Sequence, residues 1–104
     1  MLSSDGPVPV SATLNAASGA WTCTFDQSLQ PGVLDAGNWT VRSLLAPYLV
    51  TSATASGNVV SGASTGGLPA GDPAVMGYAP PPFDVVNAIG QPTFAFAGFP
   101  VIVT

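Results

Sequence analysis

Short runs of alternating apolar and polar residues, separated by turn-forming residues, constrain this fold more than any other feature of the sequence. The clearest run is residues 21–25, in which Trp21, Cys23 and Phe25 alternate with two threonines. A period of two places the apolar side chains on one face of a β-strand. The 104 residues include 12 glycines and 11 prolines, so turns are expected to be frequent and helices short. The sequence therefore predicts an all-β protein.

Similar runs recur along the whole chain. We expect strands at residues 8–14, 21–25, 38–43, 48–54, 59–60, 74–78 and 101–104, the last one following Pro100. A two-residue turn of Gly57 and Asn58 joins the fourth and fifth. Residues 1–7 are expected to form an N-terminal arm, and residues 61–73 and 79–92 long loops, with one helical turn within 84–90. About seven short strands in a single domain, residues 1–104, are typical of an immunoglobulin-like β-sandwich.

The alternation also predicts which side chains form the core. We expect five residues at or near it, namely Trp21, Phe25, Trp39, Val41 and Tyr78. The two tryptophans fill the space between the sheets, since each buries on the order of 200 Å². Cys23 is the single cysteine, so it cannot form an internal disulfide. Its place in the alternation predicts a buried free thiol.

The charged residues exclude several classes of function. Arg42 is the only cation, five aspartates are the only anions, and the net charge is −4. One arginine cannot provide the positive surface that nucleic acid or anionic lipid requires. Histidine, lysine and glutamate, on which acid–base catalysis depends, do not occur. We therefore expect no enzyme, no cofactor and no zinc site, and expect the aspartates to cap turns. A calcium site and an aspartate-based hydrolase stay open as lesser alternatives.

The same scarcity of charge points to a surface that is covered by a partner. Interface cores are depleted in lysine and glutamate. Our candidate contact residues are Pro80, Pro81, Pro82, Phe83, Phe99 and Arg42. The proline run cannot donate backbone hydrogen bonds, and both phenylalanines adjoin prolines at loop-like positions. Arg42 is either solvated or paired with an aspartate of a neighbouring subunit. Phe94 and Phe96 alternate, which predicts that they share one face.

Three stretches together carry a family resemblance. They are AWTCTFD at residues 20–26, LDAGNWTV at 34–41, and YAPPPFD at 78–84 continuing to FAGFPV at 96–101. Their order resembles that of the SwmB-type bacterial immunoglobulin-like repeats, over residues 8–104. The resemblance implies the immunoglobulin-like fold and says little about function. Residues 88–91 are less acidic than the corresponding stretch of the family, which puts a family-type calcium site in doubt.

A free-standing module of this kind resembles the small capsid decoration and head-fibre proteins of tailed phages. Residues 1–10 have no basic region and no apolar core of a secretory signal. We therefore expect a virion protein, made in the host cytoplasm, that forms homo-oligomers and binds the major capsid protein, without nucleic-acid or membrane partners. The alternative is an adhesive or carbohydrate-binding module of a bacterial cell-surface protein.

Overall fold

The computed structural model describes residues 6–43, 47–65, 74–80 and 85–104, and within them the chain is all-β. The elements are β1 (Pro9–Leu14), β2 (Trp21–Phe25), β3 (Gly32–Val33), η1 (Ala36–Asn38), β4 (Trp39–Ser43), β5 (Pro47–Tyr48), β6 (Val50–Ser56), β7 (Val59–Ser64), β8 (Ala74–Tyr78) and β9 (Phe96–Val103). The predicted all-β class is confirmed, with nine strands in place of about seven; β3 and β5 have two residues each. Among the described residues, no helix is long and apolar enough to cross a membrane.

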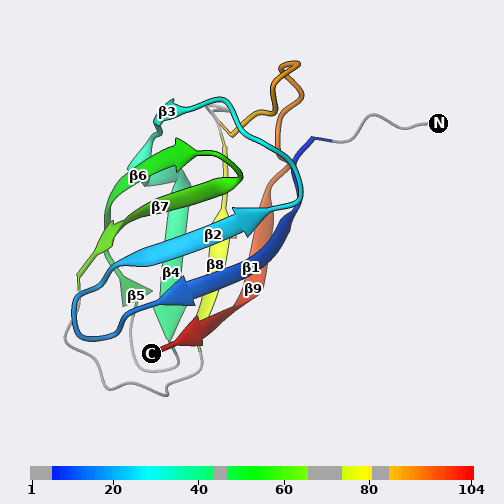
Figure 1. The fold of residues 1–104 in the computed structure, drawn as a ribbon. Coiled ribbons are helices and arrows are strands. Elements are labelled where there is room, and N and C mark those ends of the chain that lie inside the picture. The colour runs from blue at the N-terminus through cyan, green and yellow to red at the C-terminus, as the bar shows by residue number, and fades with distance from the viewer. Residues whose placement is uncertain (1–5, 44–46, 66–73, 81–84) are drawn as a thin grey trace.

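The strands form one continuous sheet that curls back on itself (Figure 1). Its order is β3-β6-β7-β2-β1-β9-β8-β4-β5, and it is mixed because β1 and β9 run parallel. Strands β2 and β4 stand four places apart in this order, which is about 19 Å in a flat sheet. The ring centroids of Trp21 and Trp39, one on each strand, are nevertheless only 5.1 Å apart. One half of the sheet therefore faces the other across the aromatic core.

The predicted core is confirmed at all five positions. Trp21, Phe25, Trp39, Val41 and Tyr78 are each at most 3% exposed. The Trp39 ring also lies 5.0 Å from Tyr78 and 6.5 Å from Phe25, centroid to centroid. The indole N–H of Trp21 donates to the Ala63 carbonyl at 3.2 Å. The two halves of the sheet thus meet through aromatic rings, and the tryptophans fill the interlayer space as expected.

Two of the turns follow directly from their sequence. Gly57 and Asn58 connect the paired residues Ser56 and Val59, and Gly57 has φ = 61°. This conformation favours glycine, so the predicted two-residue hairpin is confirmed. Between β1 and β2, the side-chain oxygen of Asn15 accepts the backbone N–H groups of Ala17 and Ser18.

The strand after that hairpin is longer than predicted. β7 runs to Ser64 because it pairs with both β2 and β6. Pairing with these two neighbours stabilises it as a strand, although its small side chains have low strand propensity. It therefore takes the first residues of the stretch 61–73 that we expected to be a loop; residues 66–73 of that stretch lie outside the described residues. The expected strand 48–54 is instead divided at Leu49 between β5 and β6.

The final strand also begins earlier than predicted, since β9 starts at Phe96 and contains Pro100. The Thr104 N–H donates to the Leu14 carbonyl of β1 at 2.9 Å. Because backbone N–H groups alternate in direction along a strand, the backbone nitrogens of residues 102 and 100 also point toward β1. Pro100 is one of these residues. Its missing N–H is tolerated because the registered β1–β9 pairing is limited to Ile102 and Val103 on β9.

Two loop expectations need correction. The described part of residues 84–90 contains a turn and no helix, because the Asn87 side-chain oxygen accepts the N–H groups of Ile89 and Gln91. Gly6 and Pro7, expected in the N-terminal arm, are buried. The Thr93 hydroxyl donates to the Pro7 carbonyl at 2.9 Å, which attaches this segment to the rest of the protein.

Replacing Trp39 with alanine is expected to lower the free energy of unfolding by about 3–5 kcal/mol, because it removes the ring that contacts both halves of the sheet. Val33→Ala is the control: Val33 is 87% exposed on β3, so its effect should stay within about 0.5 kcal/mol. Urea denaturation followed by far-UV circular dichroism measures both. Equal losses in the two variants would contradict the proposed role of Trp39.

Candidate interaction surface

Of the eight large apolar side chains that are exposed among the described residues, four lie along the β1–β9 junction. Pairing between the two strands is limited to Thr13 with Ile102 and Leu14 with Val103. Beyond this point two shallow depressions open along the junction. One, of about 220 Å³, is lined by Val10, Ser11, Ala12, Phe99, Pro100, Val101 and Ile102. The other, of about 340 Å³, is lined by Gly6, Pro7, Val8, Pro9, Thr93, Phe94, Ala95 and Phe96. We call these lining residues the β1–β9 seam.

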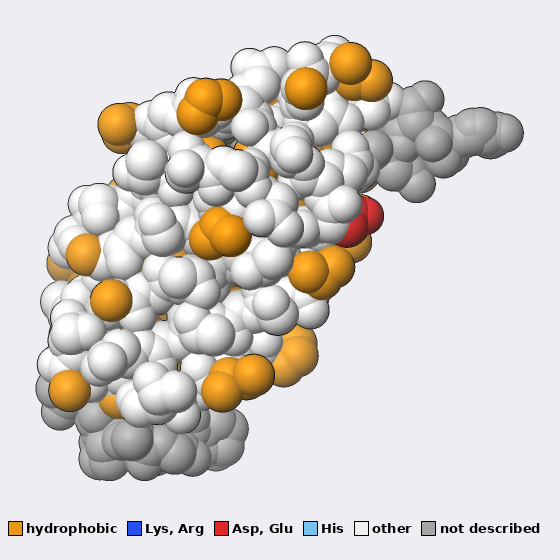
Figure 2. Space-filling model, in the orientation of Figure 1, with side chains coloured by type: hydrophobic (Ala, Val, Ile, Leu, Met, Phe, Trp, Pro, Cys, Tyr) orange, Lys and Arg blue, Asp and Glu red, His pale blue; other side chains and the backbone are white. Residues whose placement is uncertain are grey.

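Four large apolar side chains of the seam face solvent. Val8 is 49% exposed, Val10 57%, Ile102 65% and Phe94 70%. No charged residue lines either depression. Apolar side chains are visible along the edge of the molecule where β1 and β9 lie, as well as elsewhere on this face (Figure 2). Contiguous exposed apolar surface of this kind marks a binding site more often than isolated apolar residues do.

A backbone irregularity on β1 creates part of this exposure. The β1–β2 register shifts between Pro9 and Ser11, which interrupts the alternation of inward and outward side chains. Pro7 is buried, Val8 and Val10 face outward, and Ala12 is buried again. On β9, Gly98 has φ = 70° and the β8–β9 register shifts nearby. The bulge in β1 thus turns Val8 and Val10 outward, whereas the shift in β9 lets both Phe96 and Phe99 face inward, with ring centroids 6.0 Å apart.

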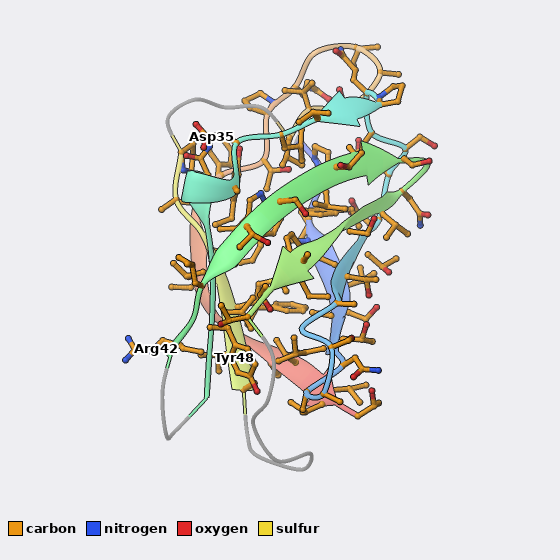
Figure 3. All side chains as sticks on the ribbon, turned by 90° about the vertical axis from the view of Figure 1, so that its left-hand side faces the viewer. Asp35, Arg42 and Tyr48 are labelled. Carbon is orange, nitrogen blue, oxygen red and sulfur yellow. The ribbon has the colours of Figure 1, made fainter. Side chains whose placement is uncertain are left out.

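A charged residue lies beyond each side of the seam. Arg42 on β4 is level with Val75 on β8, and Val75 with Pro100 on β9, so these residues form one cross-strand row. The Arg42 side chain is exposed and points away from the body of the protein (Figure 3). It forms no ion pair with any residue in the described ranges. Asp26 adjoins Val8 at the other side, where its Oδ1 accepts the Val8 N–H at 3.0 Å.

A separate depression of about 360 Å³ lies where the open ends of the sheet approach each other. Its lining includes Ala36, Gly37, Trp39, Arg42 and Tyr48. The Trp39 indole N–H here has no hydrogen-bond partner among the described residues, but the atom is buried, so a ligand in the depression does not reach it. Asp35 and Arg42 lie toward opposite ends of the molecule in Figure 3. The Asp35 Oδ1 accepts the Gly37 N–H at 2.9 Å. The predicted turn-capping role is confirmed for Asp35.

The described part of the chain offers little for catalysis. Burial raises the pKa of the Cys23 thiol from 9.0 to about 12, which keeps it protonated at neutral pH. A protonated, enclosed thiol is a poor nucleophile and a poor metal ligand. No group of three or more histidine, cysteine or acidic side chains that could hold a metal ion is found in the ranges that the structure describes.

The predicted contact residues have different locations. Phe99 lines the seam but is half-buried, packing against Phe96 with ring centroids 6.0 Å apart. Pro80 is half-buried just after β8, and Arg42 is exposed beside the seam. Pro81, Pro82 and Phe83 lie outside the described residues. The prediction that Phe94 and Phe96 share a face is wrong, because Phe94 precedes β9 and faces solvent whereas Phe96 packs on Trp39 and Tyr78.

The sequence did not identify the other exposed members of the seam. Val8 and Val10 occur in an alternating run, and alternation by itself assigns such residues to the core. Ile102 lies in the wholly apolar run 101–103, which does not indicate which residue faces outward. Pro9 and Pro100 were the available signals, since proline in a strand indicates an edge or a bulge.

No protein-family model matches the sequence, and no curated protein matches it. The fold is similar to part of the S-layer protein rSbsC(31-844), with a TM-score of 0.72 and 12% sequence identity over 92% of this chain. It is also similar to the N-terminal part of the bacterial S-layer protein SbsC, with a TM-score of 0.69 and 13% identity over 92% of this chain. The chain spans only 13% and 23% of those two proteins' lengths. At this identity the similarity establishes a shared fold.

The buried thiol makes stability depend on pH. In the unfolded chain the Cys23 thiol ionises above about pH 9, whereas in the folded protein it stays protonated up to about pH 12. The stability of the native protein should therefore fall above pH 9 by up to about 1.4 kcal/mol per pH unit, relative to Cys23→Val. Urea titrations of both proteins from pH 8 to 10.5 measure this difference. Parallel pH profiles would show that the thiol is not protected.

Two neighbouring phenylalanines provide a matched test of the seam. Phe94→Ser should change the free energy of unfolding by less than about 0.5 kcal/mol, because the ring is 70% exposed. Phe96→Ser should cost about 2 kcal/mol or more, because its ring contacts Trp39 and Tyr78. Thermal unfolding distinguishes the two variants. A large loss for Phe94→Ser would place its ring in the core and remove it from the surface.

Proposed function

We propose that this chain is a non-enzymatic structural module of a bacterial cell-surface protein layer. The observation that carries the proposal is the fold shared with S-layer protein SbsC over 92% of the chain. The apolar seam supports it, because a module that assembles into a layer needs surface that a neighbour can cover. The lack of histidine, lysine and glutamate supports a role without catalysis.

We further propose that the curled sheet is an immunoglobulin-like sandwich of the SwmB type. Two observations support this assignment. The halves of the sheet face each other across a shared core, and Trp21 and Trp39 lie in the motifs that carry the family resemblance. In place of the disulfide of antibody domains, the rings of Trp21, Trp39 and Tyr78 join the two layers.

The similarity to S-layer structures favours the cell-surface alternative over the virion protein that the sequence first indicated. Both functions require a rigid β-module with apolar contact surface, so fold alone does not separate them. The known structures that this chain resembles are, however, surface-layer proteins. The major capsid protein is consequently not proposed as its partner.

Localisation tests this function directly. Intact cells that produce the protein should release its peptides on brief protease treatment, and a surface-layer fraction extracted with chaotrope should contain the chain. A cytoplasmic enzyme serves as the control for cell lysis and should stay intact. Recovery of the chain only in purified virions, as determined by mass spectrometry, would overturn the proposal in favour of the capsid function.

A further inference from the structure

We propose that two copies of this chain pack against each other across the β1–β9 seam, related by a two-fold axis. The inference rests on the structural role proposed above and adds the partner and the surface. Three features of the described residues support it: the apolar character of the seam, the positions of Asp26 and Arg42 beside it, and the contrast with the opposite outer face of the sheet.

The centre of the proposed contact is apolar and uncharged. Val10 and Ile102 are exposed and line one depression together with Phe99 and Pro100. Val75, 37% exposed, continues this surface onto β8 beside Pro100. Burial of such side chains is the main favourable term in association. An apolar centre without charge also avoids the cost of desolvating an ionised group.

The charged residues indicate a second copy as the occupant. Arg42 is the only cation of the sequence, and Asp26 lies across the seam from it, beside Val8. In a two-fold dimer each contact occurs twice: if one residue of the first copy meets a different residue of the second copy, the same pair meets with the copies exchanged. An axis through the surface between Asp26 and Arg42 therefore places each arginine near the partner's aspartate. The result is an apolar centre with an opposite-charge pair on each side, the usual arrangement of an interface core and its rim.

The outer face of the other half of the sheet is less suited to such a contact. Thr13, Thr22, Ser61 and Thr54 form one row across β1, β2, β7 and β6. Thr13 and Thr22 already share a hydrogen bond of 2.6 Å between their hydroxyl groups. Figure 2 shows this face as mostly polar and uncharged, with scattered apolar side chains. Hydroxyl groups are well solvated by water, so covering them offers little gain.

The size of the seam determines the expected affinity. A standard stable interface uses about 20–30 residues and about 800 Å² on each partner. The seam and the row from Pro100 to Arg42 together contain fewer residues than such an interface uses. The dimer should therefore be weak, and it should be detected from how the sedimentation coefficient rises with protein concentration over the micromolar to millimolar range.

Two matched aspartate substitutions test the location of the contact. Ile102→Asp places a charge at the centre of the seam and should raise the dimer dissociation constant at least about tenfold. Val33→Asp adds the same charge at another exposed strand position, 87% exposed, and should leave the constant within about twofold. Circular dichroism confirms that both variants are folded. Equal weakening by the two substitutions would overturn the proposed surface.

A charge exchange tests the two-fold geometry. Arg42→Asp and Asp26→Arg should each weaken the dimer several-fold at low salt, and the double variant should recover most of the native affinity. The single variants' effects should shrink at about 1 M sodium chloride, because salt screens exposed charges. Failure of the double variant to recover would overturn the paired arrangement. A native protein that stays monomeric at millimolar concentration would overturn the dimer but leave surface localisation, tested separately, unaffected.

Discussion

The packing of Trp39 against rings from both halves of the sheet is the interaction on which the rest of this structure depends. Trp21 and Phe25 approach it from β2, and Tyr78 and Phe96 from β8 and β9. Each aromatic pair adds about 0.5–1.5 kcal/mol beyond the burial of its area. With a single cysteine, the chain has no internal disulfide to perform this function. The aromatic cluster therefore explains how a short chain keeps a curled sheet closed.

Closing the sheet in this way also determines what is left outside. The inward positions of β1 and β9 next to the cluster are taken by Ala12, Leu14 and Val101, which are buried. The bulge at Pro9 turns Val8 and Val10 away from that core, whereas the shift near Gly98 lets both Phe96 and Phe99 face it. The surface at Val8 and Val10 is thus a consequence of an irregular strand, since regular alternation with Ala12 and Leu14 would have buried these two side chains.

Alternation and turn chemistry made much of the fold predictable. The core at Trp21, Phe25, Trp39, Val41 and Tyr78 and the hairpin at Gly57 follow from local patterns that tertiary packing reinforces. The lengths of β7 and β9 did not follow, because pairing of β7 with β2 and β6, and of β9 with β8, extends these strands through residues of low strand propensity.

The candidate interaction surface was less predictable than the core. Phe99 and Arg42, singled out because a lone cation and a phenylalanine next to proline are local signals, lie at and beside the seam, and their contact with a partner stays a prediction. Val8 and Val10 were missed, because a shift of one residue in strand register exchanges the inner and outer faces, and the sequence does not reveal such a shift. Ile102 was missed because the run 101–103 is apolar throughout and does not indicate which residue faces outward. The side of the sheet on which Phe94 lies likewise depends on where β9 begins.

Native-state hydrogen exchange tests the central claim that the aromatic cluster closes the sheet and leaves the seam exposed. Amides of Cys23, Trp39 and Tyr78 should exchange only through global unfolding, with free energies that fall steeply as urea is added. In dilute protein, amides of Val10 and Phe94 should exchange through local openings that depend little on urea, and they should slow as protein concentration rises. If the seam amides exchanged as slowly as the core amides in dilute protein, that result would contradict this account.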